Sequence, residues 1–230
     1  MTEPAQSEKM AAFELLIGGI AHDINNPLAG VLAFTQIAMQ GAAAGSQAHQ
    51  DLKEIESSAL RCKKILEDLV ELARPKVAAE FRELDLAALI RQVLPEIFSR
   101  HPGLENRLEC RLAALPPVKL SPRHFEMAFG HLLANAFQAL GPEGKIRVEI
   151  RENGGSIELE VRDQGQGIPE QHLHQIFDPY FTTKRQRGHH GLGLALCYNV
   201  VREHGGRIEV SSKVGEGSVF KVSLPKGGQT

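Results

Sequence analysis

The chain has 230 residues, of which 26 are Lys or Arg and 28 are Asp or Glu, and 42% are hydrophobic. This hydrophobic content supports one large core or two smaller ones. The balanced charge, the 5% aromatic content and the absence of Trp argue against a nucleic-acid-binding protein. Because neither a signal peptide nor an apolar run of about 20 residues is present, the sequence predicts a soluble cytoplasmic protein without membrane contact.

The first 75 residues have the pattern of a helical hairpin. Apolar residues at three- and four-residue steps predict one helix over residues 8–41 and a second that ends before Pro75. The second helix has a heptad seam, formed by Leu52, Ile55, Ala59, Cys62, Leu66, Leu69 and Ala73. An isolated hairpin exposes such a stripe, so we expect a homodimeric four-helix bundle. The alternative is that the stripe packs against the rest of the chain.

The remainder alternates between short strands and helices. Strands are predicted near residues 81–85, 107–112 and 116–120, with a helix over 86–99. Ser121 and Pro122 predict the capped start of a helix that reaches about residue 140. Alternating segments 145–152 and 156–162 flank a Gly-Gly turn and predict a β-hairpin. A helix near 192–204 and strands 206–212 and 217–224 complete an α/β two-layer sandwich with helices on one face. The predicted domains are residues 1–78 and 79–230.

Two glycine-rich segments are candidates for contacts with a nucleotide. Asp163, Gly165 and Gly167 follow a predicted strand, where a carboxylate could contact a base while the backbone bends close to it. An ordinary turn explains the same residues. The second segment begins at Gly188 and opens a predicted helix, whose N-terminal amides favour phosphate. Its alternative is a flexible loop before a helix.

Between these segments lies an apolar stretch, residues 176–183, followed by Lys184 and further basic residues. Such a composition suits a mobile lid over a triphosphate, although a solvated loop with an apolar anchor is the alternative. Upstream, His131, Asn135 and Gln138 share one face of a predicted helix. An amide oxygen is a suitable Mg²⁺ ligand when phosphates supply further oxygens. The alternative is an ordinary solvated helix face.

Together and in this order, these motifs resemble the ATP-binding domain of sensor histidine kinases, gyrase and mismatch-repair ATPases over residues 81–225. The segment 177–184 and the upstream hairpin narrow the resemblance to histidine kinases. Residues 10–75 resemble the dimerisation and phosphoacceptor domain of that family. The resemblance implies a Bergerat-type ATP-binding fold following the dimeric four-helix bundle.

The resemblance also implies roles for individual residues. Asn135 would hold Mg²⁺, and Asp163 would accept a hydrogen bond from the adenine amino group, helped by Gly165 and Gly167. His131 stands where the family usually has Asn, and Ser218 where it usually has Thr near the base. The other residues of the expected ATP site are Gln138, Lys184, Gly188, His190, Gly191, Leu192, Gly193 and Leu194.

The motif His22-Asp23-x-x-Asn26-Pro27-Leu28 resembles the phosphoacceptor box of the family. A neutral imidazole at His22 can attack phosphorus, and the adjacent Asp23 can orient the ring and take its proton. Asn26 lies one helical turn further and could position a water for the reverse, phosphatase reaction. Pro27 is expected to bend the helix rather than end it. The alternative is a buried helix histidine and a helix end.

The resemblance implies a protein histidine kinase of a two-component system that uses ATP and Mg²⁺. It would phosphorylate its own His22 and pass the group to an aspartate of a response-regulator receiver domain, with dephosphorylation also compatible. Since 21 residues precede His22, the sensory module is expected to be a removed segment or a separate protein. The alternatives are an inactive kinase-like docking scaffold, a phosphatase-dominant enzyme and a conformational ATPase like gyrase.

Overall fold

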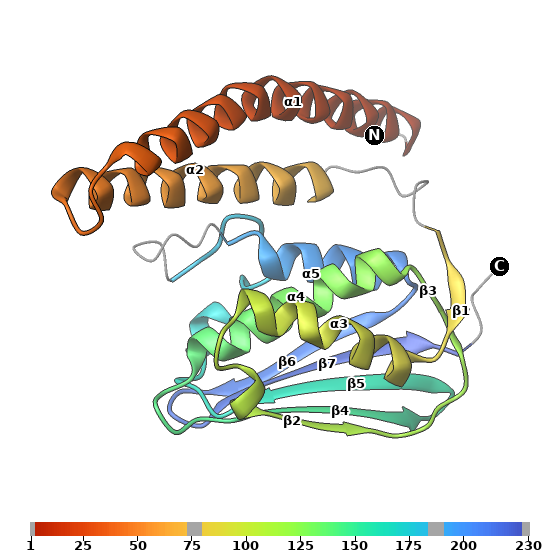
Figure 1. Ribbon diagram of the computed structural model, residues 1–230. Helices are drawn as coiled ribbons and strands as arrows, with labels where there is room; N and C mark the ends of the chain where they lie inside the picture. Colours follow the sequence, from red (N-terminus) through yellow and green to blue (C-terminus); the bar gives the residue numbers. More distant parts are fainter. Residues whose placement is uncertain (1–2, 73–79, 184–190, 227–230) are drawn as a thin grey trace. The chain divides into compact units, whose positions relative to one another are not determined.

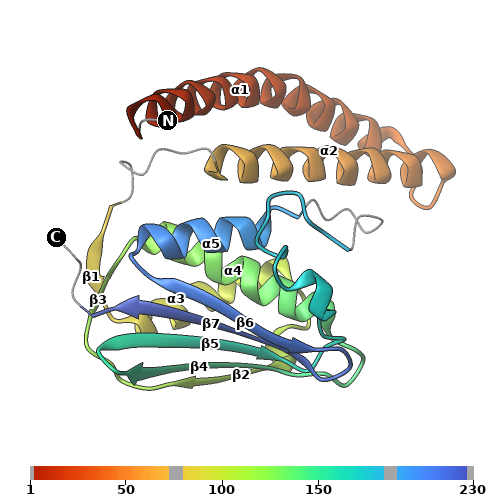
Figure 2. The same ribbon diagram turned by 180° about the vertical axis from the view of Figure 1, so that it is seen from behind.

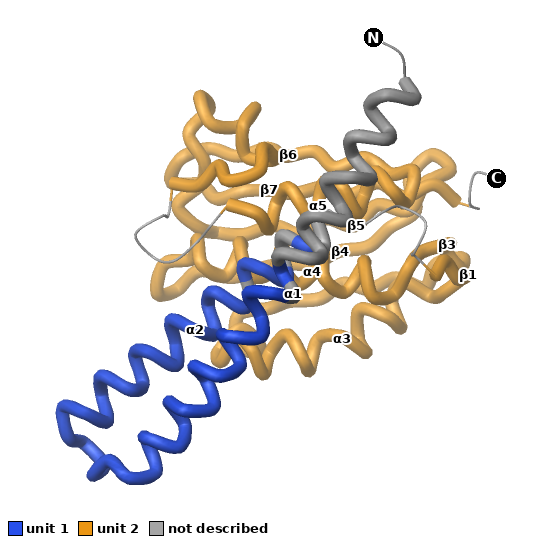
Figure 3. Tube along the Cα trace, turned by 90° about the horizontal axis from the view of Figure 1, so that it is seen from above, with its two compact units in different colours: residues 1–77, 184–190 blue, residues 78–183, 191–230 orange. Residues whose placement is uncertain are grey.

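The computed structural model describes residues 3–72, 80–183 and 191–226, which fall into two compact units (Figure 3). The first unit contains a helical hairpin, and the second contains a sheet with its covering helices. The predicted boundary after residue 78 lies outside the described residues, as do Lys184, Gly188 and His190. Among the helices of the described part, none combines the length and apolar content needed to cross a membrane.

The hairpin consists of α1 (Glu3–Gly41) and α2 (Gln47–Leu72), as predicted. Helix α1 continues through Pro27, so the Asn-Pro pair does not end it. Gly45, with φ of 83°, lies in the short connection between the helices. Where the two helices meet, Gln36 Nε2 on α1 donates a hydrogen bond to Glu56 Oε1 on α2 at 3.0 Å.

The hairpin buries only part of its apolar stripe. In the seam of α2, Ala59 is buried and Leu52 and Leu66 are half-buried, whereas Ile55 and Cys62 are exposed. Further exposed apolar side chains extend over both helices: Ile24, Val31, Phe34 and Ile37 on α1 and Leu60 on α2. The two helices therefore cover one side of the seam and leave another side uncovered within a single chain.

The second unit is an α/β two-layer sandwich, as predicted. Helices α3, α4 and α5 cover one face of a five-stranded sheet with strand order β2-β4-β5-β7-β6 (Figures 1 and 2). Strands β2 and β4 are parallel and the other pairs antiparallel. The elements are β1 (Arg82–Leu84), α3 (Leu86–Arg100), β2 (Leu108–Leu112), β3 (Val118–Leu120), α4 (Pro122–Ala139), β4 (Ile146–Asn153), β5 (Ser156–Asp163), α5 (Gly193–Glu203), β6 (Arg207–Lys213) and β7 (Gly217–Pro225).

The core lies between the sheet and its helices because the strands alternate between apolar and polar residues. Phe220 on β7, Phe129 on α4 and Ile90 on α3 are almost completely buried there. The opposite face carries charges, and Glu160 lies within 3.0 Å of Arg162 and 3.8 Å of Arg151. This polar face explains why one layer of helices is sufficient to complete the fold.

Among the described strands, β1 and β3 pair only with each other, antiparallel, with Arg82 opposite Leu120 and Leu84 opposite Val118. The sequence predicted both strands but not that they form a separate two-stranded sheet. Directly after β1, Asp85 caps α3: its Oδ1 accepts hydrogen bonds from the amides of Ala87 and Ala88 at 2.8 and 3.2 Å.

The predicted side-chain cap at Ser121 is wrong. The Ser121 hydroxyl makes no capping hydrogen bond, and instead its backbone N–H donates to His204 Nε2 at 2.9 Å. Pro122 has no N–H, so the start of α4 has one donor fewer that needs a cap. His204 accepts at Nε2 and faces the Val200 carbonyl with Nδ1 at 2.7 Å. Burial lowers the pKa of His204, which favours the neutral ring that this bond requires.

Candidate functional site

Helix α4 positions three of the residues that the sequence predicted for nucleotide binding. His131, Asn135 and Gln138 all lie on this helix and are half-buried. At the C-terminal end of α4, the Ala139 carbonyl accepts the N–H of Gln166 at 3.0 Å. Through this contact, the loop after Asp163 is held one turn from Asn135.

Asp163 is the last residue of β5 and only 3% exposed. Its Oδ1 accepts the N–H of Gly165 at 2.8 Å, which fixes the orientation of the carboxylate. Directly across the ladder from Asp163 lies Ser218 on β7, which is 4% exposed. The structure thus brings together two predicted base-contacting residues that are 55 positions apart in the sequence.

The glycines around Asp163 are needed for contacts within the protein itself. A Cβ at Gly165 would lie 2.5 Å from the Ala139 carbonyl oxygen, and one at Gly167 would lie 2.1 Å from that of Lys213. Gly167 also has a φ of 72°, which disfavours other residues. The sequence suggested that these glycines let the backbone bend close to a ligand. The structure shows that other backbone segments of the protein lie where their side chains would be.

The start of α5 is the candidate phosphate-binding end. Gly193 begins this helix, where the first amides have no intrahelical acceptor. A Cβ at Gly193 would lie 2.9 Å from His131 Nδ1, so the imidazole packs against this helix terminus. Leu192 is buried and Leu194 packs against the core, so the backbone of these two residues, rather than their side chains, is the candidate contact with a phosphate.

The apolar segment 176–183 is hydrogen-bonded to Gly191, the first residue described after position 183. The N–H of Tyr180 donates to the Gly191 carbonyl at 3.1 Å. Tyr180 has a φ of 66° and Gly191 a φ of 69°, and a Cβ at Gly191 would lie only 2.4 Å from the Phe181 carbonyl oxygen. These contacts bring residues 180–181 and 191 side by side next to the candidate phosphate-binding end.

Ser212 on β6 is a residue of this site that the sequence reasoning did not select. Its Oγ accepts the N–H of Ile168 at 2.8 Å and donates to the Gly217 carbonyl at 2.8 Å. It also lies 3.0 Å from Ser218 Oγ. The sequence signal that could have identified Ser212 is a polar residue at an inward-facing position of a predicted strand.

The candidate phosphoacceptor residues lie on α1 in the other unit. His22 and Asn26 are four residues apart on a continuous helix, so they lie on the same side of it. Asp23 and Asn26 are exposed to solvent. The carboxylate of Asp23 and the amide of Asn26 are therefore in contact with solvent.

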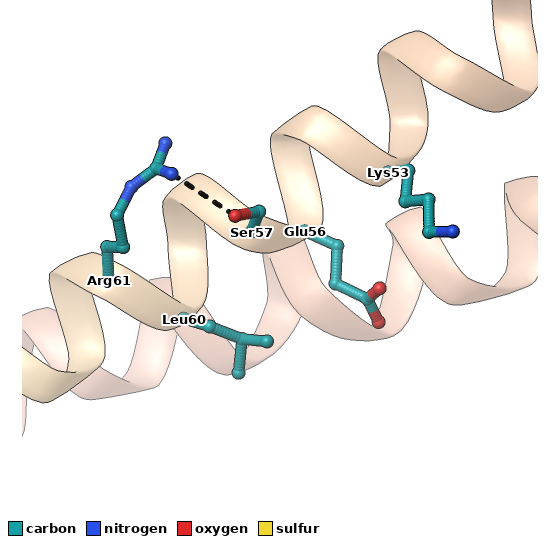
Figure 4. A pocket seen from close by; sticks show the side chains of 5 residues that line it. All are labelled: Lys53, Glu56, Ser57, Leu60 and Arg61. Atoms are coloured by element: carbon teal, nitrogen blue, oxygen red, sulfur yellow. Dashed lines mark hydrogen bonds between the residues drawn. The ribbon is translucent and has the colours of Figure 1, made fainter. Parts of the chain in front are cut away.

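A separate pocket lies on α2 and is lined by Lys53, Glu56, Ser57, Leu60 and Arg61 (Figure 4). Arg61 Nη1 donates to Ser57 Oγ at 3.2 Å along the helix. This pocket contains none of the residues predicted for nucleotide binding or for phosphoryl transfer. It is a feature of the hairpin surface.

Comparison with known proteins assigns both units to described families. Residues 121–228 match the family "Histidine kinase-, DNA gyrase B-, and HSP90-like ATPase", and residues 14–76 match the "His Kinase A (phospho-acceptor) domain". The sensor histidine kinase ZraS of Escherichia coli strain K12 is 35% identical over 226 residues, covering 97% of this chain and 48% of ZraS.

Solved structures agree with this assignment. The catalytic domain of histidine kinase ThkA is 30% identical, with a TM-score of 0.55, and the match covers 64% of this chain and 96% of that domain. ThkA in complex with the response regulator protein TrrA is 24% identical, with a TM-score of 0.67, covering 98% of this chain and 65% of that one. The chain belongs to the histidine kinase family. It spans about half the length of curated relatives such as ZraS.

Proposed function

We propose that this chain is the catalytic core of an ATP-dependent protein histidine kinase of a two-component system. The observation that supports it most directly is the coexistence of two features in one chain. A continuous helix carries His22, Asp23 and Asn26, and a separate sandwich gathers Asp163, Asn135 and the start of α5 around α4. The similarity to ZraS, which is named a sensor histidine kinase, extends over 97% of this chain and so includes both regions.

In the proposed reaction, a ring nitrogen of His22 attacks the γ-phosphorus of ATP. The new P–N bond forms as the bond to the β-phosphate oxygen breaks, and ADP leaves with that oxygen. The exposed carboxylate of Asp23 orients the ring and accepts its proton. The phosphoryl group then passes from His22 to an aspartate carboxylate of a response regulator.

At the nucleotide, Asp163 accepts a hydrogen bond from the adenine amino group, and the first amides of α5 face the phosphates. His131 packs on that helix terminus and contributes a ring nitrogen at the phosphate-binding end. The remaining contacts assigned to ATP are Gln138, Lys184, Gly188, His190, Gly191, Leu192, Gly193, Leu194 and Ser218. Lys184, Gly188 and His190 are assigned from the sequence alone.

Mg²⁺ is the cofactor that this arrangement fits. Asn135 is a half-buried amide on α4 between His131, which packs against the start of α5, and Ala139, which contacts the loop after Asp163, and an amide oxygen is a suitable hard ligand beside phosphate oxygens. When bound, Mg²⁺ neutralises charge on the phosphates. The role of Asn135 is to hold the ion and so fix the position of the triphosphate.

The proposed partners are a second copy of this chain, bound through the hairpin, and a response-regulator receiver domain. The exposed apolar residues of α1 and α2 support the dimer. The structure of ThkA in complex with the response regulator protein TrrA supports the second partner. We place the proposed reaction in the cytoplasm because it consumes ATP.

The test is incubation of the purified chain with γ-labelled ATP and Mg²⁺. We expect acid-labile, base-stable label on the protein, none on His22→Gln, and a loss of about 100-fold or more in Asn135→Ala. His49→Gln on α2 and Asn199→Ala on α5 are the matched controls and should label normally. Label that persists in His22→Gln contradicts the assignment. Nucleotide binding without any label supports the inactive scaffold instead.

The exposed amide of Asn26 supports a second activity, dephosphorylation of the same regulator. An amide one turn beyond His22 can orient a water toward an aspartyl phosphate. If so, Asn26→Ala slows loss of label from a phosphorylated regulator while autophosphorylation at His22 continues. Unchanged loss of label would assign Asn26 to helix structure alone.

A further inference from the structure

Three polar side chains form a row across adjacent strands at the base-binding end of the site. Ser212 on β6 lies directly opposite Ser218 on β7, and Ser218 lies directly opposite Asp163 on β5. Ser218 and Asp163 are almost fully buried, and Ser212 is half-buried. Because water cannot readily compensate buried polar atoms, the direction of each hydrogen bond in this row matters.

The hydrogen bonds of Ser212 determine that direction. A hydroxyl has one proton to donate and two lone pairs with which to accept. Ser212 Oγ lies 2.8 Å from the Gly217 carbonyl oxygen, which can only accept, so the Ser212 proton points there. The amide of Ile168 occupies one lone pair at 2.8 Å. The Ser212 oxygen can therefore take part in its 3.0 Å contact with Ser218 only as an acceptor.

It follows that Ser218 donates its own proton to Ser212. The reverse arrangement would direct the Ser212 proton to Ser218 and leave two acceptors 2.8 Å apart at Gly217, which is unfavourable. With its proton committed, the Ser218 oxygen can only accept from a ligand. The carboxylate oxygens of Asp163, in the ionised form, also only accept. The Ser218–Asp163 pair therefore offers acceptors alone.

We propose that Ser212 is a specificity-determining positioning residue for the nucleotide base. Because Ser212 accepts the hydrogen bond of the Ser218 hydroxyl, Ser218 and Asp163 can only accept hydrogen bonds from a base. A purine with an exocyclic amino group is selected because that group can donate to them. The carbonyl oxygen of a 6-oxopurine at the same position would face two acceptors, and this oxygen would gain no hydrogen bond from either. This inference rests on the proposed ATP site and adds a residue and a selection rule to it.

The experiment compares the binding of ATP with that of inosine triphosphate, in which a carbonyl oxygen replaces the adenine amino group. Dissociation constants come from displacement of a fluorescent nucleotide from the full chain. In Ser212→Ala, the Ser218 hydroxyl is released and can rotate to donate to the carbonyl. We expect the wild-type preference for ATP to fall by about tenfold in this variant. Ser212→Thr, which keeps the hydroxyl, should retain the preference.

Ser211→Ala is the matched control, because Ser211 is the exposed neighbour on the opposite face of β6. An equal loss of affinity for both nucleotides in Ser212→Ala, with the ratio unchanged, would show a merely structural role and overturn the proposal. If Ser212→Ala does not fold, Ser212→Cys is measured instead, since a thiol is a weak donor and acceptor of similar size. The same fall in the ratio is expected.

The results also separate this inference from the proposed function. Wild-type chain that binds ATP and inosine triphosphate equally overturns the selection rule while leaving a nucleotide-dependent kinase intact. Wild-type chain that binds neither nucleotide overturns both. A preference for ATP that survives in Ser212→Ala and Ser212→Cys overturns the role of Ser212 alone.

Discussion

Gly217 shows how a single residue holds the base-binding end of the site together. It has a φ of 89°, and a Cβ added to it would lie 2.0 Å from the Asp163 carbonyl oxygen. Its own carbonyl accepts the Ser212 hydroxyl. Any side chain at Gly217 would therefore push β7 away from the strand that ends in Asp163.

Gly217→Ala tests this tight approach against Gly215→Ala. Gly215 has a similar φ of 81° but open space where a Cβ would stand. We expect Gly215→Ala to cost roughly 1–2 kcal/mol of unfolding free energy from its backbone conformation alone. Gly217→Ala adds a steric clash and should cost about 2–4 kcal/mol, with weaker nucleotide binding. Denaturant unfolding and nucleotide titration measure both, and equal effects of the two variants would refute the close approach.

Among the described elements, the two hairpin helices expose the most large apolar side chains. Phe34 is 74% exposed and Ile37 63% exposed, although both lie within the hairpin and not at a chain end. Burying such side chains stabilises each by about 1.5–3 kcal/mol. A second copy of the same helices supplies a matching apolar surface, which is why we assign this face to the dimer.

Phe34→Asp should therefore shift the chain from dimer to monomer. A charge at the centre of an apolar interface leaves a carboxylate buried and unpaired. We therefore expect the dissociation constant of the dimer to rise by at least about 100-fold. Ala44→Asp is the control, because Ala44 is also exposed but lies in the connection between the two helices and not on their apolar face. Sedimentation measures the mass of each variant. A Phe34→Asp chain that remains dimeric at low concentration contradicts this interface.

At the scale of the whole molecule, we propose that the two units are separate domains with a boundary after residue 78. The first described strand after that boundary, β1, pairs with β3 inside the second unit, and Asp85 caps α3. The catalytic domain of ThkA, a 30% identical relative, also has a structure as a separate domain. The sandwich should therefore fold without the hairpin.

A fragment of residues 79–230 is expected to fold and bind ATP but to carry no label, since His22 is missing. A shorter fragment that starts at residue 86 lacks both β1 and the Asp85 cap and should be less stable by about 1–3 kcal/mol. Thermal unfolding and nucleotide titration compare the two fragments. Equal stability would place the true boundary after β1, and an unfolded 79–230 fragment would show that the units depend on each other.

Local sequence patterns predicted most of the fold. Periodic apolar residues indicated α1, α2 and the helices of the sandwich, and the Asn153-Gly154-Gly155 turn indicated the β4–β5 hairpin. Gly154 and Gly155 have positive φ angles of 55° and 90°. Because this turn conformation favours glycine, a Gly-Gly pair between two alternating segments indicates a hairpin. These features depend on near neighbours in the chain, so they can be inferred without tertiary information.

Other features depend on residues that are far apart in the sequence, and only the tertiary structure decided them. The amide of Ser121 finds its acceptor on His204, and β1 finds its partner in β3. Gly165 and Gly167 are glycine because distant backbone approaches them. The sequence determined which chemical groups the site contains. The folded sheet determined that Ser212 aligns beside Ser218 and that Ser218 aligns beside Asp163, because strand register sets which side chains lie opposite one another and can form a hydrogen bond.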